Sequence, residues 1–150
     1  MKLYKYIILI LSTAITACST LVLEPSDFSW PVESVLIPDD NGTVAEERYS
    51  VSFNTKGLFF EEMQDSSAFR GKEIRLIRDT QGFYFITGDK FKNVYVFRAY
   101  DGAMVMANKI FISEFGIEKP AFNQRIPFIE LVESGKSLML NSQGISGGQK

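Results

Sequence analysis

The sequence predicts an all-β fold: a single antiparallel meander domain of about eight or nine strands, arranged as a partly open barrel or a sandwich. Short runs of β-branched and aromatic residues recur along the chain, separated by turn residues at intervals of roughly 8 to 12 residues. Several runs alternate with period two; in RYSVSF, for example, Tyr49, Val51 and Phe53 share one face. No stretch has the length and period of a long helix.

The expected strands follow Val35 in order. They cover residues 44–53, 57–63, 72–78, 83–88, 93–100, 103–112, 126–133 and 137–140. Asp101-Gly102 is the strongest hairpin indicator among the turns, because a type I′ turn needs positive φ at both central positions. Residues 61–70 are a weak helix candidate, and residues 113–125 are expected to form the longest ordered loop.

Two of these runs, FYFI (83–86) and VYVF (94–97), are apolar on both faces. A sheet with one face in water would alternate apolar and polar residues. These strands therefore predict a sheet covered on both sides, or a barrel whose outer face is also in contact with another structure. A partly open meander, a lipocalin-like barrel and a sandwich are all compatible with this pattern, and the near-sequential hairpins favour the meander.

The first seventeen residues have the layout of a secretory signal peptide. Lys2 and Lys5 form a short basic region, and an uncharged, mainly apolar segment runs from Tyr6 to Ala17. About 20 apolar residues are needed to cross a bilayer, so this segment is too short to be a typical transmembrane helix. It is therefore excluded from the predicted domain.

Ile15-Thr16-Ala17-Cys18 resembles the lipobox of bacterial lipoprotein precursors: an aliphatic residue, a modest residue, a small residue and then cysteine. The resemblance implies cleavage between Ala17 and Cys18 and a diacylglycerol on the Cys18 sulfur. In many such proteins the new amine is acylated as well. Two or three acyl chains hold a protein on a membrane permanently, since each buried CH₂ contributes about 0.8 kcal/mol. The alternatives are ordinary signal-peptidase cleavage, for example after Ala14, and an uncleaved anchor.

The resemblance also implies where the protein lies. Residue 19, directly after the cysteine, is serine and not aspartate. In enteric-type Gram-negative bacteria this implies sorting to the outer membrane, and we expect its periplasmic face. In a Gram-positive cell the same sequence would imply the outer face of the cytoplasmic membrane.

Four segments are expected: signal peptide 1–17, lipidated N-terminus and tether 18–33, β-domain 34–142 and disordered tail 143–150. Trp30 in the tether is expected to close one end of the core. Removal of Lys2 and Lys5 with the signal peptide changes the net charge from −2 to −4. This balance gives no basic footprint for nucleic acid. Cys18 is the only cysteine, so the chain must fold without an internal disulfide.

The chain contains no histidine, the usual general base and the commonest metal ligand. We therefore expect no cofactor, no metal site and no catalytic residues, although carboxylate pairs alone can hydrolyse glycosides. Acidic pairs occur at residues 39–40, 46–47 and 61–62, but neighbours on a strand point to opposite faces. PDDNG (38–42) has turn chemistry and lacks the spacing of an EF-hand.

Other side chains are weighed as binding candidates. Glu130 lies on an otherwise apolar face and is the best candidate for a perturbed carboxyl group, unless an arginine partner or solvent explains it. A basic group could contact an anionic partner, but a solvated strand face is the simpler interpretation. Met104 and Met106 share a face and are expected in the core. The basic group comprises Arg70, Lys72, Arg75, Arg78, Lys90 and Lys92.

The leading hypothesis is a non-catalytic, lipid-anchored cell-envelope protein whose β-domain binds another envelope component, most simply a protein. The alternative is a carrier of a lipid or other apolar ligand in a lipocalin-like cavity. The thirteen Phe residues in the sequence could line such a cavity, of roughly several hundred Å³. An enzyme is the least favoured class.

The lipobox makes one direct prediction. Intact mass spectrometry of the full chain, extracted from membranes with detergent, should give a mature mass that begins at Cys18 and carries diacylglycerol. The variant Cys18→Ala should lack that modification. An unlipidated mature chain that begins at Ile15 would contradict the prediction.

Overall fold

The computed structural model describes residues 32–147, and the sequence predictions for Ala17, Cys18 and Trp30 lie outside this range. The described part is all-β with one α-helix, α2 (Lys56–Met63), and a short 3-10 turn, η1 (Glu47–Tyr49). Its eleven strands are β1 (Ser34–Leu36), β2 (Thr43–Glu46), β3 (Val51–Asn54), β4 (Ile74–Arg78), β5 (Phe83–Gly88), β6 (Asn93–Tyr100), β7 (Ala103–Phe111), β8 (Ala121–Arg125), β9 (Phe128–Glu133), β10 (Lys136–Asn141) and β11 (Gly144–Ile145).

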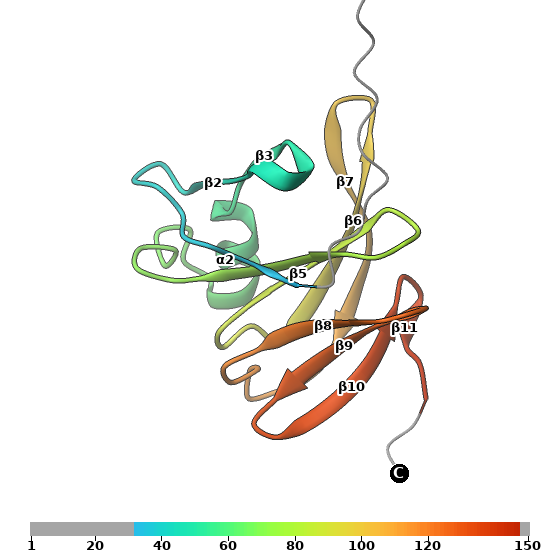
Figure 1. The fold of residues 1–150 in the computed structure, drawn as a ribbon. Coiled ribbons are helices and arrows are strands. Elements are labelled where there is room, and N and C mark those ends of the chain that lie inside the picture. Colours follow the sequence, from blue (N-terminus) through green and yellow to red (C-terminus); the bar gives the residue numbers. More distant parts are fainter. Residues whose placement is uncertain (1–31, 148–150) are drawn as a thin grey trace, which may run out of the picture.

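The strands form three antiparallel sheets. The largest has the order β1-β4-β5-β6-β7, the second β11-β10-β9-β8, and β2 pairs with β3. Two sequential meanders, β4 to β7 and β8 to β11, confirm the predicted hairpin connectivity (Figure 1). The sheets do not close into a barrel. The strand number exceeds the prediction because the expected strand 44–53 is a hairpin, broken by η1, and because β1, β8 and β11 are not among the expected strands. One expected strand, residues 57–63, is lost to helix α2.

The central strands of the five-stranded sheet are buried on both faces, as their sequence predicts. On one face, Ile77, Phe85 and Val96 pack in a cluster with Ile129 and Leu131 of the four-stranded sheet. Successive residues of a strand point to opposite sides, so the other face presents a second apolar set to α2 and to the β2–β3 pair. This second cluster includes Leu58, Phe59, Ile74, Leu76, Tyr84, Ile86, Phe91 and Tyr95.

Helix α2 corrects the prediction of a strand at residues 57–63, and it overlaps the weak helix candidate 61–70 only at its end. Leu58 and Phe59 are buried and Met63 packs against the same cluster, which is the spacing of one helix face. In so short a segment, three consecutive apolar residues fit a strand equally well. Gln64 ends the helix in the left-handed conformation, with its N–H donating to the Phe60 carbonyl.

Other predicted boundaries move by a few residues. The expected loop 113–125 ends earlier, because its last five residues form β8. The prediction of a disordered tail from residue 143 is wrong for its first residues, because β11 pairs with β10. Glu33, placed in the tether, already belongs to the domain: its carboxylate accepts from the Phe122 N–H at 2.7 Å and pairs with Arg75 at 2.8 Å.

The predicted turn chemistry at Asp101-Gly102 is confirmed. Their φ angles are 48° and 75°, which fit a type I′ turn, and Tyr100 pairs directly with Ala103 across it. The β6–β7 hairpin closed by this turn extends well beyond the rest of the large sheet (Figure 1).

The connection from β7 to β8 is held against the turn between β5 and β6. The Lys90 N–H donates to the Ile117 carbonyl, and the Ile117 N–H donates to the Phe91 carbonyl, both at 2.7 Å. Gly116 permits this approach: a Cβ there would lie 2.6 Å from the Lys90 carbonyl oxygen, and its φ is +85°.

Gly116→Ala should therefore lower the free energy of unfolding by roughly 2–4 kcal/mol, through left-handed strain plus overpacking. The matched control is Gly135→Ala, where φ is +82° but nothing lies within 4 Å of the new Cβ. It should lose only about 1–2 kcal/mol. Urea unfolding measures both, and equal losses would refute the close-approach argument.

Candidate functional site

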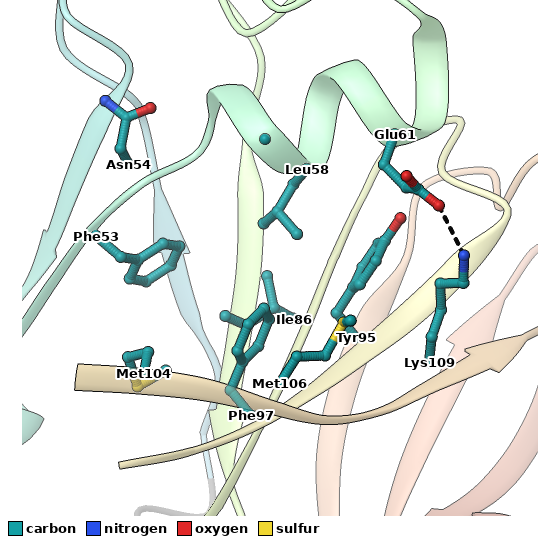
Figure 2. Close-up of a pocket in the computed structure, with 11 residues that line it drawn as sticks. Phe53, Asn54, Leu58, Glu61, Ile86, Tyr95, Phe97, Met104, Met106 and Lys109 are labelled. Carbon is teal, nitrogen blue, oxygen red and sulfur yellow. Dashed lines mark hydrogen bonds and ion pairs between the residues drawn. The ribbon is translucent and has the colours of Figure 1, made fainter. Parts of the chain in front are cut away.

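An open, mainly apolar groove of about 400 Å³ lies between α2 and the outer end of the large sheet. Figure 2 shows its apolar side chains between the helix and strands β6 and β7, with Glu61 and Lys109 at one end. The apolar lining comprises Phe53 of β3, Leu58 of α2, Ile86 of β5, Phe97 of β6, and Met104 and Met106 of β7. Asn54, Gly57 and Tyr95 complete it.

A β-bulge in β7 determines which of its residues face the groove. Phe97 pairs with Met106 and Val96 pairs with Asn108, so Ala107 is the extra residue. Met104 and Met106 therefore share one face, as the sequence predicts. Met104 packs against the second apolar cluster, whereas Met106 is exposed and lines the open groove instead of lying in the core. Because the bulge reverses the alternation, Lys109 opposite Tyr95 returns to the groove face.

The polar end of the groove is an ion pair. Glu61 Oε1 lies 2.7 Å from Lys109 Nζ, and both side chains are about half exposed, at 53% and 42%. The hydrogen bond and charge of Glu61 raise the pKa of Lys109 above its ordinary value. An exposed pair of this kind contributes little to stability, so its charges are available to a ligand.

Glu62, next to Glu61, fastens α2 to the sheet beneath the groove. Its carboxylate accepts from the Lys92 N–H at 2.6 Å, from Asn93 Nδ2 at 2.8 Å and from the Tyr95 hydroxyl at 2.7 Å. Burial first, and then the bond to Glu62, raise the pKa of Tyr95, so its hydroxyl stays a donor. The Tyr95 side chain is thereby held with its ring in the groove wall.

This arrangement suits binding. The apolar walls remove a guest's hydrocarbon surface from water, and the ion pair supplies one donor and one acceptor at a fixed end. Among residues 32–147, no group of three acidic, Cys or His side chains is placed to hold a metal ion.

The candidate carboxyl group Glu130 lies outside the groove. Arg125 Nε is 3.0 Å from Glu130 Oε2, and Asn123 donates to the same oxygen at 3.3 Å. Burial opposes ionisation, but these bonds outweigh it and lower the pKa of Glu130. An arginine partner thus accounts for this carboxylate, which is one of the interpretations that the sequence left open.

The PDDNG segment is turn chemistry. Asp39 Oδ1 accepts from the Asn41 and Thr43 N–H groups at 2.9 and 2.8 Å.

The basic group predicted from the sequence is divided among different surroundings. Lys72, Arg75 and Lys90 line a second pocket of about 610 Å³ together with Lys119, and Glu73, Asp89 and Glu118 offset most of this charge. The Arg78 guanidinium instead lies over the rings of Tyr49 and Tyr84, at 5.9 and 5.7 Å from their centres. The structure therefore offers no concentrated basic surface at these residues.

Sequence reasoning missed Phe53, Leu58 and Phe97 as site residues. Each belongs to a different sheet or to the helix, and only the packing of α2 over β6 brings them together. The one available indication was the pair Met104 and Met106, because two flexible methionines on an exposed hairpin are typical of adaptable binding surfaces.

The contacts of Glu62 predict a large difference between two adjacent carboxylates. Glu62→Ala should lower the free energy of unfolding by roughly 2–3 kcal/mol, because it leaves a buried hydroxyl and two other donors without their acceptor. Glu61→Ala removes only an exposed ion pair and should cost less than about 1 kcal/mol. Urea unfolding of both variants is the measurement; similar losses would show that Glu62 does not fasten the helix.

Within residues 32–147, no helix has the length and apolar character needed to cross a membrane. Comparisons with protein-family models, with curated proteins and with solved structures found no match to this chain. The groove and its surroundings are therefore interpreted on their own chemistry.

Proposed function

We propose that this chain is a non-catalytic, lipid-anchored cell-envelope protein whose β-domain binds another envelope component in the α2–β7 groove. The anchor is the diacylglycerol on Cys18 that the lipobox-like sequence implies. In a Gram-negative cell the domain would lie at the periplasmic face of the outer membrane. The short tether would keep the groove close to that membrane.

The single observation that carries the proposal is the open apolar groove itself. Met106 is 55% exposed in its wall, and Phe53, Phe97 and Met104 beside it are only half-buried. Contiguous apolar surface of this kind is costly to leave in water and marks an interaction site. Because the groove is open along β7, a protein partner could insert apolar side chains into it. The flexible methionines of its wall can adapt to the shape of such a partner.

A second candidate is a lipid or other apolar ligand. The groove volume of about 400 Å³ falls within the range of roughly 300–1,000 Å³ found for small-molecule sites. Its lining includes Phe53 and Phe97, in keeping with the aromatic cavity expected of a carrier. The groove is open rather than enclosed, however, so a hydrocarbon chain in it would remain partly in water. This cost places the carrier second.

The test compares two β7 variants of equal exposure. Met106 lines the groove and Phe111 does not, yet both side chains are 55% exposed. The full chain, tagged at its C-terminus and produced in a Gram-negative bacterium, would be extracted from membranes and analysed by native mass spectrometry. Met106→Glu should remove the bound component because a carboxylate would be buried against Phe97, whereas Phe111→Glu should retain it.

The mass of that component separates the two candidates, since a protein and a lipid differ by an order of magnitude. A wild-type chain that carries nothing, or a component that is lost equally from both variants, would overturn the groove as the binding site.

A further inference from the structure

The outer edge of β7 is the long unpaired strand edge of the described domain. β7 ends the five-stranded sheet, spans nine residues and pairs only with β6. Other edges are short or occupied: β1 has three residues, β11 has two, and β8 forms a bridge with Val32. A free edge of this length is a template for a further strand.

The hairpin turn fixes which backbone groups of β7 face outward. Across a two-residue loop, the flanking Tyr100 and Ala103 exchange hydrogen bonds, and bonded pairs then alternate along the ladder. Ala103 and Val105 therefore bond to β6, whereas the N–H and C=O groups of Met104 and Met106 point away from it. Neither backbone has a partner elsewhere among residues 32–147.

We propose that this edge pairs with the same edge of a second copy of the chain, antiparallel and two-fold symmetric about Val105. A two-fold axis perpendicular to a sheet keeps a given side chain on the same face in both copies. With the axis at Val105, Val105 of one copy lies opposite Val105 of the other. In that register Met104 of each copy lies opposite Met106 of the other, and all four outward backbone groups of each strand are satisfied.

The absence of charge along the centre of β7 fits this register. A two-fold pair places every central residue near its own copy, so a charge there would repel itself. Residues 102–108 carry no charge. No residue of the paired stretch therefore faces a like charge on the second copy. The first charges on either side, Asp101 and Lys109, lie on opposite faces of the sheet because the bulge at Ala107 reverses the alternation, so they make no contact across the axis.

The pairing would also join the two grooves. Met104 and Met106 face the groove in each copy, and the symmetry keeps them on the same face of the combined sheet. The regular pairing covers few residues, because the bulge interrupts it at Ala107 and Asn108 bonds to the Ser142 carbonyl. The contact is therefore weak in dilute solution and is favoured where copies are concentrated, as on a membrane surface.

Oxidative cross-linking of the full chain in membranes tests the register. Residues opposite each other in a non-bonded antiparallel pair have Cβ atoms about 4.5–5.5 Å apart, close to the roughly 3.5–4.5 Å of a disulfide. Val105→Cys should form a disulfide-linked dimer at least roughly tenfold faster than Phe115→Cys. Phe115 is the control because it is 93% exposed and lies in the β7–β8 connection. The wild-type chain, whose only cysteine is Cys18, keeps the proposed anchor and is the control for any contribution of Cys18 to cross-linking.

Two further substitutions in the Val105→Cys chain distinguish a disulfide formed through backbone pairing from one formed by random collision of two copies. Met106→Pro deletes an outward N–H without removing a bond to β6, and proline is tolerated at such edge positions. Met106→Ala removes the same side chain but keeps the N–H. Proline should abolish the dimer and alanine should not. Met104→Pro provides a second test if circular dichroism shows that Met106→Pro is unfolded.

Equal cross-linking of Val105→Cys and Phe115→Cys, or cross-linking that survives proline at both outward positions, would overturn the interface. These results do not depend on whether the groove binds an envelope component, because the experiment follows only the chain itself.

Discussion

The burial of both faces of one sheet is the constraint on which the rest of the structure depends. Strands β5 and β6 place apolar side chains on both sides, so a single covering layer would leave half of them in water. The four-stranded sheet covers one face and supplies its own apolar side. The helix and the β2–β3 pair cover the other. The order of elements along the chain therefore reflects the need for a layer on each side.

The groove arises because the second layer is smaller than the face it covers. Helix α2 has only eight residues, and it buries the middle of the sheet through Leu58 and Phe59. The outer strand and the end of the hairpin extend past it, so Met104 and Met106 face open space. Glu62 keeps the helix at this position through its three accepted hydrogen bonds. A larger layer would have turned the same residues into ordinary core.

The proposed anchor and the groove complement each other physically. Acyl chains on Cys18 would confine the domain to a membrane surface, where weak contacts between copies or with other envelope components become effective. An open apolar groove would be a liability for a freely diffusing protein at high concentration. Confinement at a membrane makes the same surface useful, because potential partners are oriented and close. The bulge at Ala107 limits uncontrolled strand pairing along β7.

The sequence alone determined the features that depend on local chemistry. Alternation and turn residues gave the all-β class, the sequential hairpins and the Asp101-Gly102 turn, since backbone conformation at these positions follows from neighbouring residues. The doubly apolar strands correctly predicted a sheet covered on both sides. The sequence also carries the lipobox-like segment, which remains a prediction because it lies outside the described residues.

The tertiary structure alone decided the features that depend on contacts between distant segments. Residues 57–63 form a helix because they must cover a sheet that follows later in the chain, and short apolar segments have no local preference strong enough to show this. The bulge, the position of Lys109 and the assembly of Phe53, Leu58 and Phe97 into one groove likewise follow from packing. Periodicity identifies which face of an element is apolar. It does not identify which other element will pack against that face, or whether the face will remain exposed.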